Sequence, residues 1–420
     1  MSVPASLAGS WWGEFALVRV ELGIVDSWTP SGDQWDGALW DESTWGESYL
    51  TPSSWIDLTP DVESVDIDTG RNGVDDPGDV GTASVEVFDP LGTYSIAGPG
   101  RSAIGNLLRV TIEARAAGRS LVTFHGKVTD ASSVGDLAAP STSLKAIDLL
   151  GAVLSTDDTD PLPAQSVTAR LTDLLDRAGV PVELRDLADD ATALLALDKV
   201  GNRLDGARGA VASSIGGTLW AGGDGTIYYR FGSFLIDPAT APGYVIGTEP
   251  GAVCPAALNL AEQGDDVVNV YDWTTSDQEA PLNASAIDAE SVRRFGRKAS
   301  VRTDLLNADQ GELRALVDAE IARTGWQPER VESCTIPVHD DASAALVAVQ
   351  LRELVDFSYT GSAPWSARQL VGSYAHHITP DEWSIELKCY PAIVESQWDV
   401  AAWDVDTWSL GVLPTSRKVA

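Results

Sequence analysis

The chain has 420 residues, of which 44% are hydrophobic and 21% charged, and these fractions are typical of a globular protein rather than a disordered one. It carries 62 acidic against 28 basic residues, and the net charge of -34 opposes binding to nucleic acid through phosphate contacts. No apolar run approaches the ~20 residues of a membrane-spanning helix, and residues 1–9 lack the features of a secretory signal, so we expect assembly in a cytoplasm.

The first 150 residues predict a β-rich unit. Apolar and polar residues alternate in five segments, which are 14–23, 82–88, 107–114, 121–130 and 143–147. Turn-rich gaps separate these predicted strands, as in a small β-barrel or sandwich. Residues 26–55 interrupt the pattern with a stretch rich in Trp, Gly, Ser, Asp and Pro. We therefore expect a β-barrel-like domain at 1–150 with a Trp-rich insertion at 26–55.

The middle of the chain changes from a period of two to a helical period. Leu171, Leu174, Leu175 and Ala178 recur at helical spacing, and Ser166 is a plausible N-cap for that helix. A second helix is predicted at 203–215. A hairpin follows, with strands at 218–221 and 226–230 around a Gly-rich turn. These elements predict a small α+β domain at 151–245.

Residues 246–395 again mix strands and helices. A strand is predicted at 267–273, and Asp309 with Glu312 indicates a capping box that starts a helix. Val347, Leu351 and Leu354 predict a second helical stripe, and strands at 369–374 and 382–390 close the unit. We expect a second β-rich domain with two helices at 246–395 and a Trp-rich tail at 396–420. The predicted class is α+β and β-rich, with two barrel-like units flanking the smaller domain.

A twelve-residue repeat lies near the two ends of the chain. Residues 34–45 and 397–408 match at eight of twelve positions, and their tryptophans fall five residues apart. That spacing fits neither a helical stripe nor strand alternation. Three interpretations stay open: a loop packed on its own domain, a contact with a neighbouring subunit, and a platform for carbohydrate. The candidate interface aromatics are Trp35, Trp40, Trp45, Trp398, Trp403 and Trp408.

No pattern of catalytic or metal-binding residues stands out. The four histidines are His125, His339, His376 and His377; the last two are adjacent, so on a strand they face opposite sides. The three cysteines lack metal-ligand spacing, and no familiar catalytic motif occurs. The acids of the turn-rich loops, including Asp75, Asp76, Asp79, Asp157, Asp158 and Asp160, are expected to be solvated. We expect no catalytic residue, no cofactor and no metal.

Several short segments together resemble minor tail proteins of long-tailed phages that infect actinobacteria. More distantly, they are similar to the central hub proteins of contractile-tail baseplates. The segments are 55–59 with Val62, Val65 and Gly70-Arg71; 81–89 with Gly92 and Tyr94; 108–110 and 121–128; 144–150; 216–221 with 224–230; and 371–383. Their order and spacing carry the resemblance, because each one is short.

The resemblance implies a hub ring at the tail tip of the virion. Two tube-type units per subunit would line the tube, so that three subunits form a pseudo-sixfold ring. The implied partners are further copies of the chain, a distal tail ring, the tape measure and other minor tail proteins. DNA would only pass through the ring during ejection. Relatives that digest cell wall carry an appended domain, so we expect no enzymatic activity.

Two further interpretations stay open. Exposed Trp repeats would favour a host receptor- or carbohydrate-binding module of the tail tip. A wall-degrading hydrolase would need two carboxyl groups ~5–10 Å apart across a cleft. In a ring, some of the acids would face the lumen, where repulsion of phosphate would keep passing DNA from adhering.

Overall fold

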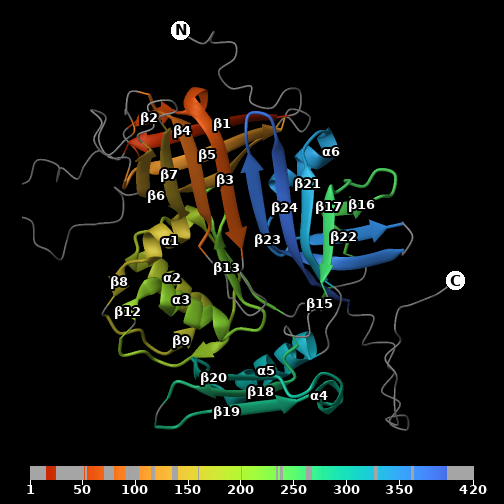
Figure 1. The fold of residues 1–420 in the computed structure, drawn as a ribbon. Helices are drawn as coiled ribbons and strands as arrows, with labels where there is room; N and C mark the ends of the chain where they lie inside the picture. Colours follow the sequence, from red (N-terminus) through yellow and green to blue (C-terminus); the bar gives the residue numbers. More distant parts are fainter. Residues whose placement is uncertain are drawn as a thin grey trace, which may run out of the picture.

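The protein is described by a computed structural model (Figure 1). It describes residues 16–24, 52, 54–70, 80–90, 94, 104–114, 119–134, 141–158, 160–199, 201–232, 235–236, 240–261, 267–277, 279–325, 330–360 and 364–394. One large antiparallel sheet occupies the upper part of Figure 1. A layer of helices and short strands lies below it on one side, and a small sheet with two helices lies at the bottom. The fold is thus α+β and β-rich, as predicted.

Residues 16–148 build the first half of the large sheet. Its strands are β1 (Ala16–Ile24), β2 (Ser54–Asp57), β3 (Val62–Gly70), β4 (Thr82–Phe88), β5 (Leu107–Ala114), β6 (Arg119–Val134) and β7 (Ser141–Asp148), with a 3-10 helix at Thr59–Asp61. Their order is β3-β4-β7-β6-β5-β1-β2. The first part of β6 pairs with β5 and the last part with β7, so this strand belongs to two layers. Gly126 lies at the change of partner, where a Cβ atom would be 2.1 Å from the backbone oxygen of Ile147.

Residues 244–391 contribute the second half in the same manner. Its elements are β16 (Tyr244–Gly247), β17 (Ala257–Ala261), β21 (Arg330–Pro337), α6 (Asp341–Ala344), a 3-10 helix (Ala345–Ala348), β22 (Leu354–Tyr359), β23 (Trp365–Ile378) and β24 (Trp383–Pro391). The start of β23 pairs with β22, and its later part pairs with β24. Gly372 lies at the bulge between these parts, where a Cβ atom would be 1.8 Å from the ring of Tyr390.

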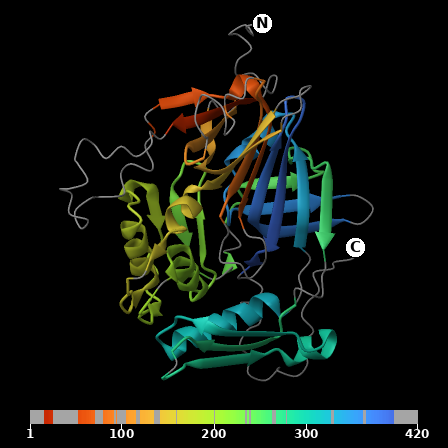
Figure 2. The same cartoon turned by 60° about the vertical axis from the view of Figure 1, so that its left-hand side comes forward.

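β3 and β23 join the two halves into a 13-stranded sheet (Figure 2). Apolar residues of both halves form one buried cluster between the folded layers, including Val65, Ile67, Val85, Ile385 and Leu387. Within the described residues the path of the sheet is open, with β2 at one end and β17 at the other. The two units predicted to be barrel-like therefore do not close into barrels there.

A second core belongs to residues 149–230. Its elements are α1 (Leu149–Leu154), β8 (Asp157–Asp158), β9 (Gln165–Ser166), α2 (Val167–Arg177), a 3-10 helix (Val182–Leu184), β10 (Arg185–Leu187), β11 (Ala193–Leu194), β12 (Gly201–Asn202), α3 (Arg203–Ala212), β13 (Thr218–Ala221) and β14 (Ile227–Arg230). The hydroxyl oxygen of Ser166 accepts a hydrogen bond from the backbone N–H of Ala169 at 3.2 Å, which confirms the predicted N-cap. The predicted hairpin is present as β13 and β14.

A third core lies within residues 267–325. The strands β18 (Val270–Thr275), β19 (Asn283–Ile287) and β20 (Ala299–Leu305) form a sheet in the order β19-β18-β20. One face of this sheet packs on α5 (Gln310–Thr324) through Tyr271, Trp273, Leu313, Leu316 and Val317. The short helix α4 (Ala289–Phe295), which the sequence pattern did not predict, connects β19 to β20. A parallel pair, β15 (Leu235–Ile236) and β25 (Ile393–Val394), completes the elements of the described chain.

Two local predictions need correction. The stripe of Val347, Leu351 and Leu354 is not one helix: Val347 lies in the 3-10 turn, Leu351 follows it, and Leu354 starts β22. These residues are apolar because all three are buried, not because they share a helical face. The Asp309 carboxylate caps α5 by accepting from Gly311 and Glu312. The Glu312 carboxylate, however, accepts from the N–H of Ala193, so it links the second and third cores.

Candidate assembly surface

The junction between β3 and β23 is the structural centre of the large sheet. It pairs residues 65–70 with 373–378 in antiparallel register. His377 Nδ1 and Asp66 Oδ1 lie 2.5 Å apart across the junction, and both side chains are 54% exposed. Beneath the junction His376 is buried, so the two adjacent histidines face opposite sides as predicted. Burial lowers the pKa of His376 to about 4.

Eight strands run side by side across this junction, and their outer face is polar. The order is β17-β21-β24-β23-β3-β4-β7-β6. One row of directly opposed residues crosses six of the strands, from Ser384 through His377, Asp66, Ser84 and Lys145 to Asp130. Among the outward-facing residues that have a strand partner and lie outside the bulges, five are acids and three are lysines. They are Asp66, Asp68, Glu86, Asp130, Glu386, Lys127, Lys145 and Lys388. Many of the remaining outward residues are Ser and Thr, and the bulge residues Glu63 and Glu332 are also exposed, so this face is hydrated and moderately acidic.

The two ends of this eight-stranded array have no strand partner among the described residues. β17 pairs with β21 alone. At the other end, residues 129–134 of β6 pair only with β7, because β5 pairs no further along β6 than Lys127. Leu260 on β17 is 45% exposed. Unpaired strand edges with exposed apolar side chains favour pairing with another chain.

Strand direction alternates through the whole array. Each of its seven neighbouring pairs is antiparallel. With eight strands, the two end strands run in opposite directions. A β17 edge of one copy can therefore lie beside the free end of β6 in the next copy and continue the antiparallel pattern.

The second core is fixed to both halves of the large sheet. The hairpin of β13 and β14 reaches the first half, where a Cβ atom on Gly223 would lie 2.2 Å from the backbone oxygen of Val122. Arg352, which follows the 3-10 turn of the second half, donates from Nη1 to the carbonyl oxygen of Gly216 at 2.7 Å. Arg352 has a φ of 66°, a strained conformation for a residue other than glycine. These contacts hold the second core in a fixed position relative to the polar face.

A buried carboxylate organises the interior of the second core. Asp190 is 1% exposed and accepts hydrogen bonds from the hydroxyl of Tyr229 at 2.7 Å and that of Ser214 at 2.5 Å. The N–H of Thr192 is a third donor. Despite burial, these hydrogen bonds hold the pKa of Asp190 below its ordinary value, whereas burial next to Asp190 raises that of Tyr229. Every donor is satisfied within the core, so the arrangement is structural.

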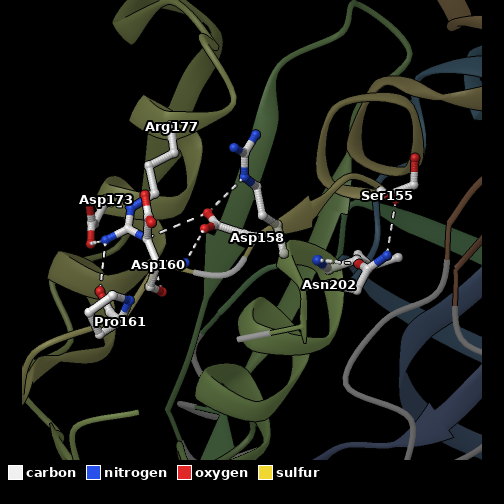
Figure 3. A network of polar contacts seen from close by, with 9 residues as sticks. Ser155, Asp158, Asp160, Pro161, Asp173, Arg177 and Asn202 are labelled. Carbon is white, nitrogen blue, oxygen red and sulfur yellow. Dashed lines mark hydrogen bonds and ion pairs between the residues drawn. The ribbon is translucent and has the colours of Figure 1, made fainter. Parts of the chain in front are cut away.

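Asp158 corrects the prediction that the loop acids are solvated (Figure 3). Its side chain is 4% exposed and lies 3.0 Å from Arg203 Nε and 3.5 Å from Arg177 Nη1. It also accepts from the N–H of Asp160. These donors hold the pKa of Asp158 below its ordinary value against burial. Asp157 and Asp160 are exposed as predicted, whereas Asp75, Asp76 and Asp79 lie outside the described residues.

Within the described part of the chain, no group of three or more His, Cys, Asp and Glu side chains could hold a metal ion. No described helix has both the length and the apolar character needed to cross a membrane. The predicted interface aromatics fall outside the described residues; they are Trp35, Trp40, Trp45, Trp398, Trp403 and Trp408. Their role stays a prediction. The junction of β3 and β23 was missed at the sequence level because nothing local pairs residues 311 positions apart.

Comparison with solved structures shows that the fold occurs in phage tail proteins. The tail protein from Neisseria meningitidis MC58 is 13% identical and superposes with a TM-score of 0.59, over 90% of this chain and 96% of that one. The 43 kDa tail protein of prophage MuSo2 from Shewanella oneidensis is 11% identical with a TM-score of 0.53, over 81% and 96% of the two chains. No protein-family model and no curated protein sequence matches this chain.

Proposed function

We propose that this chain is a non-enzymatic structural protein of a phage tail tip. Three copies, the number that the hub resemblance implies, form a ring that continues the tail tube and lets DNA pass during ejection. The ring would also hold the distal tail ring, the tape measure and further minor tail proteins. The virion is its final location, after assembly in the cytoplasm of the bacterial host.

The observation that carries this proposal is the polar eight-stranded array with an unpaired strand at each end. Head-to-tail contacts between identical subunits close into a ring when the rotation between them permits it. Pairing β17 of one copy with residues 129–134 of the next satisfies both free edges. The shared fold with phage tail proteins supports a structural role in a tail.

In such a ring the polar outer face of the array would line the passage. Ser, Thr and mixed charges give hydrated walls without a strong field of either sign. The regularly paired positions carry five acids against three lysines, and the exposed bulge residues Glu63 and Glu332 add two acids, which is a small excess beside the net charge of -34. The repulsion of DNA inferred from the sequence would thus be mild, and most of the negative charge would lie on other surfaces.

A single substitution on the β17 edge tests the ring. Leu260→Lys places a charge on the exposed edge and should block strand pairing between copies. Val245→Lys is the matched control, because Val245 is 42% exposed on β16, a strand outside the array. We expect L260K to be lost from purified tails and V245K to be incorporated like wild type. Equal incorporation of the two variants would refute pairing through β17.

A further inference from the structure

Four basic residues lie within six positions of this acidic chain. They are Arg293, Arg294, Arg297 and Lys298, at the end of α4 and in the turn before β20. We call this group the basic turn. The chain has only 28 basic residues among 420, and no acid interrupts residues 291–300. Basic side chains in the last turn of a helix interact favourably with the helix dipole. This accounts for Arg293 and Arg294 but not for Arg297 and Lys298, which lie beyond the helix.

The basic turn is held in a fixed shape by a buried side chain. Asn269 is fully buried; its Oδ1 accepts from the N–H of Lys298 at 2.8 Å, and its Nδ2 donates to the carbonyl oxygen of Gly296 at 2.8 Å. The carbonyl oxygen of Lys298 also accepts from the N–H groups of Asn269 and Val270. A surface that is already ordered loses less conformational entropy when it binds a partner.

Two exposed apolar side chains lie on the sheet next to the basic turn. Ile287 at the end of β19 and Val301 on β20 are each 67% exposed. They share the face of the small sheet opposite α5, because each lies in register with a residue of β18 on that face: Ile287 with Val270, which is buried, and Val301 with the exposed Asp272. Apolar side chains beside unpaired charges are typical of a protein interface. Arg293 and Arg297 are exposed and have no ion-pair partner within the described chain.

We propose that the basic turn and the neighbouring sheet face dock on an acidic surface of a second copy of this chain. The inference rests on the proposed ring. Charge complementarity selects the occupant: each copy carries -34, so a neighbour presents mostly acidic surface, and copies packed together repel one another. At the basic turn, the positive side chains would instead attract the acidic surface of the neighbouring copy. α4 lies at the bottom of Figure 1, away from the large sheet, so the basic turn would lie outside the proposed DNA passage.

Zero-length cross-linking in assembled tails tests the contact directly. A carbodiimide couples a lysine amine only to a carboxylate that touches it. In tails purified from particles that carry this chain, we expect Lys298 of one copy to couple to a carboxylate of a second copy. The coupled acid would be one that lies too far from Lys298 within a single copy for a direct cross-link. Coupling only to other tail proteins, or no coupling of Lys298, would overturn the proposal. Absence of the chain from tails would instead refute the proposed function.

Charge reversal gives an independent measurement. R293E/R297E should lower incorporation into tails by about tenfold or more, because like charges would then face each other across the contact. R19E/K199E is the matched control, since it makes the same change in net charge at exposed sites elsewhere. R293Q/R297Q, which removes charge without reversing it, should give an intermediate loss. Equal unfolding midpoints of the purified variants separate a contact from a folding defect. Incorporation of R293E/R297E at the level of its control would contradict the inference.

Discussion

The two halves of the large sheet share one construction but bury different side chains. In each half a long strand serves two layers and changes partner beside a glycine. The first half fills its interior mainly with aliphatic residues such as Val65, Ile67 and Val85. The second half buries Cys334, Tyr374, His376, Trp383 and Cys389. The same backbone path therefore accommodates larger and more polar side chains in the second half, where His376 Nε2 is buried without a hydrogen-bond partner among the described residues. We expect the second half to be more sensitive to truncation.

Truncation of the largest of these side chains should have the largest effect. Trp383 is 3% exposed, and its Nε1 donates to His376 Nδ1 at 3.4 Å. We expect Trp383→Ala to lower the free energy of unfolding by about 3–5 kcal/mol. Ile67→Val in the first half removes one methylene and should cost about 0.5–1.5 kcal/mol. Urea unfolding measures both, and equal losses would contradict the contrast.

Acid should destabilise the fold through one histidine in each half, His376, which is buried, and His125, which is half-buried. The pKa of both His125 and His376 is lowered to about 4, in each case mainly by burial. The unfolded state therefore binds protons first, so stability present above pH ~6.5 is lost as the pH falls towards 4. For the fully buried His376 the loss is about 3 kcal/mol.

Substitutions separate the two histidines. His376→Phe should flatten the dependence of unfolding free energy on pH between about 6.5 and 4. Arg109 also lowers the pKa of His125 but not that of His376. Arg109→Gln should therefore raise the pKa of His125 alone, as observed by NMR titration of the two imidazoles. A parallel change at both histidines would count against this account.

The ion pair of the second core should contribute an intermediate amount. Asp158→Asn keeps the shape but removes the charge that Arg177 and Arg203 share. We expect a loss of about 1–3 kcal/mol, since both arginines remain partly exposed and can be hydrated. Asp173→Asn, at a more exposed partner of Arg177, is the control and should cost less than about 1 kcal/mol. Thermal unfolding at neutral pH compares the two variants.

The smallest effect is expected at the junction of the two halves. His377 and Asp66 are both 54% exposed, so water screens their interaction. Asp66→Ala should change the free energy of unfolding by at most about 1 kcal/mol. A loss of several kcal/mol would mean that this pair, rather than the apolar core beneath it, holds the halves together.

The sequence predicted local structure well and long-range structure poorly. The strand at Thr82–Phe88, the cap at Ser166 and the opposite faces of His376 and His377 follow from periodicity and side-chain chemistry, and the structure confirms them. The pairing of β3 with β23 depends on two segments 311 residues apart, and no local pattern encodes it. Asp158 was taken as solvated because its neighbours are loop residues, whereas its arginine partners come from two helices. For the Trp repeats, periodicity gave no assignment at all.

The central claim is that the polar eight-stranded array lines a ring in the tail tip. Electron cryomicroscopy of intact tails, with subunits identified by mass spectrometry, tests it most directly. We predict three copies around the tail axis, with the face that carries Asp66 and His377 towards the passage and β17 of each copy beside β6 of the next. A peripheral position of the chain, or a ring with this face turned away from the axis, would contradict the account.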